Sequence, residues 1–451
     1  MSRSSRCLAV LVLGLLALSV GYGAAPVASQ AGANDPVYEQ GLQWGLQRIG
    51  APSAWARGTG RGVTIAIVDS GADLGHQDLR DKVVGQVSCI GANGNPDRCS
   101  GSAQDDNGHG THVSGIASAT TGNRLGIAGV APDARLLVVR VLANDCNATR
   151  CTASGTASDV AAGIRWAVAH GAKVINLSLG GGAVQAAVGC SFCDAIEEAW
   201  AQGAIAVVAA GNDSVLPSGF RDEPAVVVTA TDRNDQRASY SNSSSGILAV
   251  ARWPVAAPGG EGETEASDCA TGGTPKGIIS TYWQAGQSDM YACLAGTSMA
   301  APHVSGALAV LLSAGHSPQS AIDRLTTTAT DLGPPGRDDS FGFGLIDLAK
   351  AVGPADAPTP TASGSPTTRP PSSGVTGAAG SAPSAVSTTV PVAPGSTVPP
   401  VTIPDVSAAQ PFETEPSDDE GPPAWLVVLA LASLVVSGTG TGAAAWRLRA
   451  P

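Results

Sequence analysis

The sequence predicts an α/β domain of three layers, in which helices cover both faces of a mainly parallel central sheet. Three observations support this fold class. Short apolar runs rich in β-branched residues recur along the chain, as expected of strands buried on both faces. Helical patterns that end at a glycine lie between some of them. A mixed apolar and polar composition continues from Asp35 to Val352, which is long enough for one large core.

The expected elements can be placed in chain order. Strands are expected at 63–68, 135–141, 173–178, 204–209 and 225–229, and helices at 111–120, 158–170, 194–202 and 298–314. In such sheets, chemistry gathers beyond the carboxyl ends of the strands. That rule directs attention to Asp69, to the stretch 178–180 and to Asn212.

The two ends of the chain predict export and membrane anchoring. Expected boundaries are a signal peptide at 1–31, a folded domain at 32–352, a linker at 353–423, a transmembrane helix at 424–446 and a cytoplasmic stub at 447–451. Arg3 and Arg6 precede a short apolar run, as in a secretory signal peptide, although an uncleaved anchor is the alternative.

The anchor is predicted from an uncharged, largely apolar segment near the C-terminus. It is long enough to cross a bilayer, Trp425 and Trp446 lie at its borders, and Arg447 and Arg449 follow it. The positive-inside rule then places the folded domain outside the cell, as a single-pass membrane protein. A buried globular helix is the alternative. The preceding Pro-, Ser- and Thr-rich linker has too few large apolar residues to fold.

Cysteine use agrees with an oxidising compartment. Beyond Cys7, the cysteines form four neighbouring pairs, and an even set in an exported chain suggests disulfides. We favour local pairing among Cys89, Cys99, Cys146, Cys151, Cys190, Cys193, Cys269 and Cys293. The spacing of Cys190 and Cys193 also leaves a redox role open. The formal net charge of −12 and the lack of a basic run give no positively charged surface for binding nucleic acid.

Four residues, each in a short motif of its own, together suggest a site for acyl-transfer chemistry. Asp69 ends an expected strand, His109 lies between two glycines, Ser298 begins a long helix, and Asn212 follows another strand. Each has an ordinary structural alternative, such as a cap or a turn. Together they supply a nucleophile, a base, an orienting acid and an oxyanion donor. His112 lies three residues after His109, but the spacing matches no zinc motif.

These motifs, their order and their spacing resemble the subtilisin family of serine peptidases, and thermitase-like members in particular. Residues 296–303 read Gly-Thr-Ser-Met-Ala-Ala-Pro-His, and segments 41–55 and 126–132 are typical of the same group. The resemblance implies a subtilisin-like fold and an endopeptidase with Asp69, His109 and Ser298 as its triad. Asn212 would be the oxyanion donor, and His112 would be structural.

The resemblance also implies subsites and a cation. Extended polypeptide substrate would pair with Ser178, Leu179 and Gly180. The pocket for the substrate side chain that precedes the scissile bond would be lined by Ala209, Ala210 and Gly211. Structural Ca²⁺ is implied at the side chains of Asp35, Asp78 and Asn123 and the carbonyls of Thr120, Leu125 and Ile127, with no cofactor needed for the chemistry.

Signal peptide, peptidase domain, Pro-rich stalk and anchor together look like mycosins, the peptidases of actinobacterial type VII secretion systems. That topology adds a secretion complex as an expected partner. The main alternative hypothesis is a non-catalytic scaffold subunit of such a complex. A serine esterase shares the acyl chemistry, but the chain lacks the Gly-x-Ser-x-Gly elbow. Only about ten residues separate the earliest plausible signal end, at Ala24, from Asp35. Either the domain needs no folded propeptide, or this short segment is its whole pro-region.

Overall fold

The computed structural model describes residues 33–146, 151–179, 190–214, 218–246, 249–261, 269 and 275–353. All of them fall within one unit of the chain, Met1–Pro404. The expected signal peptide, almost all of the linker, the transmembrane segment and Gly180 lie outside the described residues. No helix among the described ranges is both long and apolar enough to cross a membrane.

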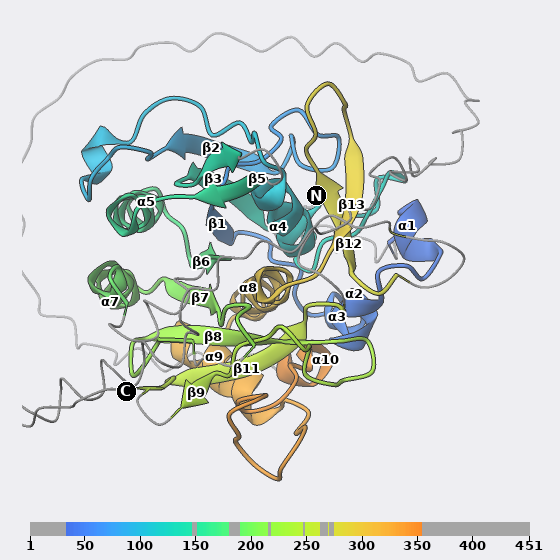
Figure 1. Ribbon diagram of the computed structural model, residues 1–451. Helices are drawn as coiled ribbons and strands as arrows, with labels where there is room; N and C mark the ends of the chain where they lie inside the picture. The colour runs from blue at the N-terminus through green and yellow to red at the C-terminus, as the bar shows by residue number, and fades with distance from the viewer. Residues whose placement is uncertain are drawn as a thin grey trace, which may run out of the picture. The chain divides into compact units, whose positions relative to one another are not determined.

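Within these ranges, a seven-stranded sheet of parallel pairs forms the middle layer (Figure 1). Its spatial order is β11 (Trp253–Pro258), β8 (Ala225–Thr231), β7 (Ile205–Ala209), β6 (Val174–Leu177), β1 (Thr64–Asp69), β3 (Arg135–Arg140) and β2 (Val83–Ser88). The five inner strands are those expected from the sequence, with small shifts at their ends. The subtilisin-like α/β class is therefore confirmed.

The two edge strands were not expected, and each has a local reason. In β2, exposed and partly buried residues alternate over most of its length, so it lacks a continuous apolar run. In β11, Pro254 and Pro258 interrupt the strand pattern. Proline cannot donate to a ladder and is found mainly at sheet edges. Both strands therefore show the composition of an edge rather than of an inner strand.

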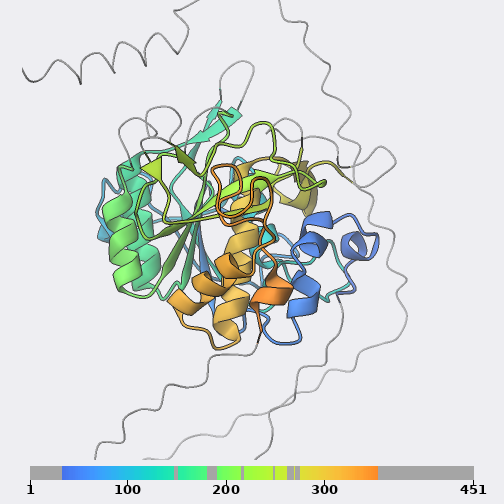
Figure 2. The same cartoon turned by 90° about the horizontal axis from the view of Figure 1, so that it is seen from below.

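Helices cover both faces of the sheet (Figure 2). On one side lie α5 (Ala157–Ala169) and α7 (Cys193–Ala201), and on the other lie α4 (His109–Ser118), α8 (Thr297–Ser313) and α9 (Pro318–Thr327). The strand pleat divides the core accordingly. Ile65 and Ile67 of β1 join the cluster that includes α4 and α8, and Val68 joins the cluster that includes α5 and α7.

Shorter elements complete the described part. Helices α1 (Pro36–Glu39), α2 (Trp44–Arg48), α3 (Ala51–Ala54), α10 (Leu348–Ala351) and the 3₁₀ turn Pro96–Arg98 are one or two turns long. The two-stranded pairs are β4 (Ala143–Cys146) with β5 (Cys151–Ser154), β9 (Ser245–Gly246) with β10 (Ala249–Val250), and β12 (Ile278–Tyr282) with β13 (Met290–Leu294). The last pair leads directly into α8.

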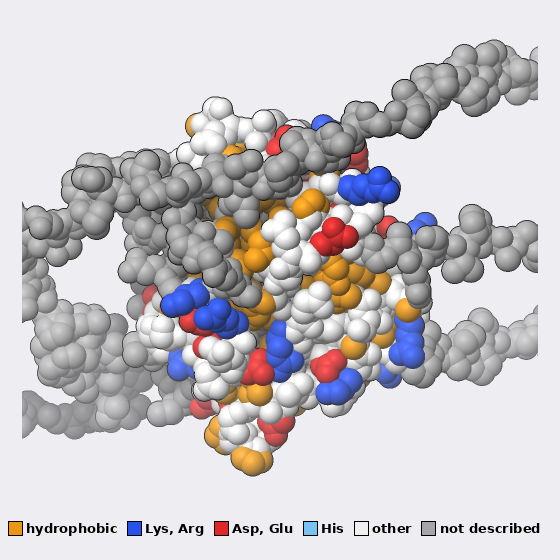
Figure 3. Space-filling model, turned by 90° about the vertical axis from the view of Figure 1, so that its right-hand side faces the viewer, with side chains coloured by type: hydrophobic (Ala, Val, Ile, Leu, Met, Phe, Trp, Pro, Cys, Tyr) orange, Lys and Arg blue, Asp and Glu red, His pale blue; other side chains and the backbone are white. Residues whose placement is uncertain are grey.

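Three of the expected local disulfides are present: Cys89–Cys99, Cys190–Cys193 and Cys269–Cys293. In the β4–β5 hairpin the backbone register sets Cys146 opposite Cys151, but a bond between them lies outside the described side chains. Figure 3 shows one face of the molecule, on which acidic and basic side chains are interspersed. The charge on that face therefore favours neither an acidic nor a basic binding partner.

Helix α8 begins at Thr297, one residue before the expected start, and it contains Pro302 in its interior. Proline has no N–H, so the carbonyl of Ser298 loses the donor that normally lies four residues later. The Ser178 hydroxyl donates to that carbonyl instead, at 2.7 Å. A side chain from outside the helix thus compensates for the proline.

Candidate active site

Asp69 lies at the carboxyl end of β1 and is fully buried. Its Oδ1 accepts hydrogen bonds from the Ser70 amide and from His109 Nδ1, both at 2.7 Å. The first turn of α4 packs tightly on this strand end. A Cβ on Gly110 would stand 2.1 Å from the Gly71 carbonyl oxygen and 3.1 Å from Asp69 Cβ. Glycine at position 110 therefore allows the helix to bring His109 to the carboxylate.

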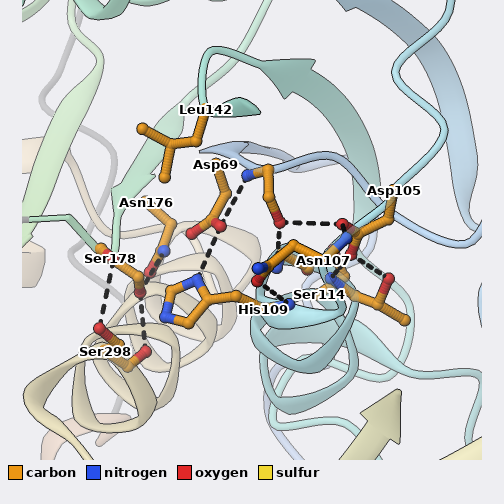
Figure 4. A network of polar contacts seen from close by, with 12 residues as sticks. Asp69, Asp105, Asn107, His109, Ser114, Leu142, Asn176, Ser178 and Ser298 are labelled. Carbon is orange, nitrogen blue, oxygen red and sulfur yellow. Dashed lines mark hydrogen bonds and ion pairs between the residues drawn. The ribbon is translucent and has the colours of Figure 1, made fainter. Parts of the chain in front are cut away.

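His109 is the first residue of α4, after Gly108 in a left-handed conformation with φ of 101°. Its side chain is 25% exposed, so one edge of the ring can reach a ligand. In Figure 4 the imidazole lies between Asp69 and Ser298. Burial alone would lower the pKa of His109, but the charge of Asp69, the hydrogen bond to it and the charge of Asp105 together raise that pKa above the ordinary value.

Ser298 is the second residue of α8, where free backbone N–H groups favour negative charge. Its hydroxyl donates to the Ser178 carbonyl at 3.3 Å, while the Ser178 hydroxyl donates to the Ser298 carbonyl (Figure 4). Asn176 Nδ2 donates in turn to Ser178 Oγ at 2.9 Å, and Ser305 of α8 donates to Asn176 Oδ1. These contacts fix the helix start against the end of β6.

Asn212 follows the end of β7 and faces the same helix start. Its Oδ1 accepts from the Thr297 amide at 3.0 Å and from the Thr297 hydroxyl at 2.9 Å. That hydroxyl also accepts from the Gly211 amide. Since the side-chain oxygen of Asn212 already accepts these bonds, its Nδ2 is the side-chain atom that can donate to a ligand. Nδ2 lies 3.4 Å from the position that a Cβ on Gly296 would take.

The expected subsite residues surround this point. Ser178 and Leu179 follow β6, and Ser178 contacts Ser298 directly. Ala209 and Ala210 are buried at the end of β7, and Gly211 has φ of 103°, which suits glycine. Gly180 lies outside the described residues. His112, one helical turn after His109, is buried and bonds the Ala292 carbonyl through Nε2, away from the Asp69 carboxylate.

The residues expected to hold Ca²⁺ also lie together. Asn123 Nδ2 donates to Asp78 Oδ1 at 2.8 Å, and the amides of Gly122 and Asn123 donate to Asp35. Both carboxylates are buried. Burial raises the pKa of Asp35 to about 6, with backbone hydrogen bonds opposing and the charge of Asp78 adding to the rise. Burial likewise raises the pKa of Asp78.

This donor set fits a hard cation in part. Two buried carboxylates lie close together, and among the described residues neither forms an ion pair with a basic side chain. The Thr120 hydroxyl is buried without a hydrogen-bond partner, and the Thr120 amide donates to the Asp78 carbonyl. Oxygen donors of mixed kind suit Ca²⁺. Within the described ranges, no group of three or more His, Cys, Asp or Glu side chains converges on one point.

Sequence reasoning missed the residues that hold the site in place. They are Ser70, Asp105, Thr111, Asn176, Thr297 and Ser305. The available signal was proximity to a motif, since Asp105 precedes His109 by four residues and Thr297 precedes Ser298. Their roles depend on contacts between distant segments, which no local pattern reports.

Comparison with known proteins identifies the family of the chain. Residues 60–344 match the model of the subtilase family. The chain is 39% identical to thermitase from Thermoactinomyces vulgaris over 71% of its own length and 98% of that protein. It is 35% identical to subtilisin Savinase from Lederbergia lenta, over 69% and 99% of the two chains. A solved protease from Pseudoalteromonas arctica superposes with a TM-score of 0.56 at 30% identity, covering 71% of this chain and 99% of that one.

The fold and the site define a serine endopeptidase, a hydrolase that acts on polypeptide substrates. The chain belongs to the subtilase family.

Proposed function

We propose that the chain cleaves peptide bonds through Asp69, His109 and Ser298, by way of an acyl-enzyme, with Asn212 as oxyanion donor. The observation that carries the proposal is the 2.7 Å bond from His109 Nδ1 to Asp69 Oδ1. It leaves Nε2 of the ring on the side of Ser298. Asp69 thereby fixes the tautomer in which Nε2 can take a proton.

The reaction follows from these positions. His109 Nε2 takes the Ser298 proton as the hydroxyl oxygen bonds to the scissile carbonyl carbon. The carbonyl oxygen becomes an oxyanion, toward which Asn212 Nδ2 and the Ser298 amide donate. The imidazolium then gives its proton to the leaving amine as the C–N bond breaks. Water repeats the cycle on the ester, releasing the acid and restoring the Ser298 hydroxyl.

The Ser298 hydroxyl donates to the Ser178 carbonyl in the free protein, so it must turn toward His109 before it attacks. That rotation is about a single side-chain bond, and catalytic hydrogen bonds are often loose in free enzymes. A substrate strand that pairs with residues 178 and 179 competes for the same carbonyl. Binding of substrate therefore favours the reactive orientation of Ser298.

Replacing the nucleophile tests this proposal. Ser298→Ala should abolish casein hydrolysis and fluorophosphonate labelling, while Ser320→Ala, a matched change at a half-buried position in α9, should leave both intact. Peptide and ester substrates of the same acyl group are compared to separate a peptidase from an esterase. Labelling that persists in Ser298→Ala would refute the assignment.

We also propose that Asp35, Asp78 and Asn123, with the carbonyls of Thr120, Leu125 and Ile127, hold a structural Ca²⁺. The ion would neutralise two carboxylates that share one buried site. Binding to the folded state alone raises the melting temperature. Chelator should therefore lower it in the parent but not in Asp78→Asn, and an unchanged parent midpoint contradicts a strong site.

The proposed setting is the outer face of a cell membrane, with anchorage by segment 424–446 and export by segment 1–31. The charge asymmetry around the apolar segment supports this orientation. Protease accessibility in intact cells, compared with a chain truncated after residue 423, tests it. The mycosin-like topology extends the proposal to a type VII secretion complex, and co-purification from solubilised membranes is the corresponding test.

A further inference from the structure

We propose that Asp105 is a positioning residue for His109, a second buried carboxylate that ties the strand bearing Asp69 to the helix bearing His109. The inference rests on the proposed function, because it assigns His109 the role of base. Asp105 lies in the loop before α4 and is only 1% exposed. It forms no ion pair with a basic side chain among the described residues.

Its carboxylate accepts four hydrogen bonds. Oδ1 accepts from the Ser70 hydroxyl and from the Asn107 amide, both at 3.0 Å. Oδ2 accepts from the Thr111 amide at 2.9 Å and from the Thr111 hydroxyl at 2.5 Å. Figure 4 shows part of this set beside His109. Four donors satisfy the acceptor capacity of an ionised carboxylate.

The directions of the two hydroxyl groups are determined by their other partners. Ser70 Oγ accepts from the Gly110 amide at 2.9 Å, and Thr111 Oγ1 accepts from the Asp73 amide at 2.9 Å. Each hydroxyl therefore has its proton left for Asp105. Since every partner of the carboxylate is a donor, the charged form is the one that the surroundings match.

These partners flank the Asp69–His109 pair on both sides. Ser70 follows Asp69 and donates its amide to Asp69 Oδ1, while Gly110 and Thr111 follow His109 in the first turn of α4. The Asp105 amide also donates to the Ala72 carbonyl. One carboxylate thus fixes both backbone segments whose spacing sets the 2.7 Å contact between Asp69 and His109.

The charge of Asp105 should also act on His109. The titratable groups that act on that ring are Asp69 on β1, Asp105 on the loop and His112 on α4. Asp106, next to Asp105, forms an ion pair with Arg140 at the end of β3. Burial lowers the pKa of His112 to about 3, so it stays neutral. Asp69 and Asp105 stabilise the imidazolium, and removing either negative charge lowers the pKa of His109.

The test is the pH profile of kcat/KM for Asp105→Asn, with a peptide anilide that the parent protein cleaves. Active sites are counted by fluorophosphonate titration, so that misfolded protein does not enter the rate. The acidic limb reports the pKa of the free base. It should move to lower pH, because the imidazole loses a stabilising charge. The plateau should fall about tenfold, as expected when a charge-assisted hydrogen bond to the site is lost.

Two further variants separate charge from position. Ser70→Ala removes the hydroxyl bridge but keeps the carboxylate, so kcat should fall at similar KM while the acidic limb stays near that of the parent. Asp97→Asn removes one negative charge from an exposed side chain in the 3₁₀ turn Pro96–Arg98, outside this network, and it should change neither quantity.

The outcomes are distinguishable. An active parent whose acidic limb is unchanged in Asp105→Asn overturns the inference and leaves the proposed function intact. If Asp105→Asn does not fold, Ser70→Ala decides, and an unchanged kcat overturns the inference. A parent protein that neither hydrolyses peptide nor labels at Ser298 overturns the proposed function and the inference with it.

Discussion

Asn212 illustrates how neighbouring residues can prepare one side chain for its proposed function. Its Oδ1 accepts two hydrogen bonds from Thr297, which leaves Nδ2 as a preorganised donor. Asn212→Ala should lower kcat by about 10²–10³ with little change in KM, the size known for an oxyanion donor of this family. Steady-state kinetics check this, with Asn234→Ala, the same change at an exposed position, as the control. A loss confined to KM would contradict the role.

At this scale the sequence singled out the proposed reacting groups but not the residues that hold them in place. Asp69, His109 and Ser298 lie in motifs with unusual glycine contexts, so local pattern suffices to single them out. Asp105 precedes a motif but looks like an ordinary loop acid. Its four hydrogen bonds join two separate segments, Ser70 directly after β1 and the stretch from Asp105 to Thr111. Such a role is a property of tertiary contact, which the spacing of residues along the chain does not encode.

At the scale of elements, the end of β6 and the start of α8 depend on each other. Pro302 deprives the Ser298 carbonyl of its helical donor, and the Ser178 hydroxyl replaces it at 2.7 Å. Ser178→Ala should therefore destabilise the fold by about 1–3 kcal/mol, the cost of a buried carbonyl without a partner. Urea unfolding in a Ser298→Ala background, which prevents self-digestion, measures this.

The same background offers a compensating variant. Pro302→Ala restores a backbone N–H four residues after Ser298, so the double variant Ser178→Ala/Pro302→Ala should recover part of the lost stability. A purely additive pair of changes would show that the proline and the hydroxyl are not coupled.

The inner strands were predictable because apolar runs of β-branched residues have few alternatives. This coupling was not, since it required knowing that the Ser178 hydroxyl, 120 residues away along the chain, meets the Ser298 carbonyl.

For the whole molecule, buried neutral histidines link stability to pH. Burial lowers the pKa of His303 to about 4 and that of His112 to about 3. Both groups take up protons more readily in the unfolded chain, where the ordinary value is about 6.5. Their contribution to stability is complete above that value and is lost as pH falls toward the folded-state pKa. Each should cost about 2 kcal/mol between pH 7 and 5.

The slope of stability against pH tests this more cleanly than stability itself, because replacing a buried side chain also changes packing. Unfolding by urea at several pH values should show His303→Gln losing about 2 kcal/mol less than the parent between pH 7 and 5. His170→Gln, the same change at the exposed C-cap of α5, is the matched control. Equal slopes in the parent and His303→Gln would mean that His303 is protonated alike in both states. His112 would then remain as the buried histidine that links stability to pH.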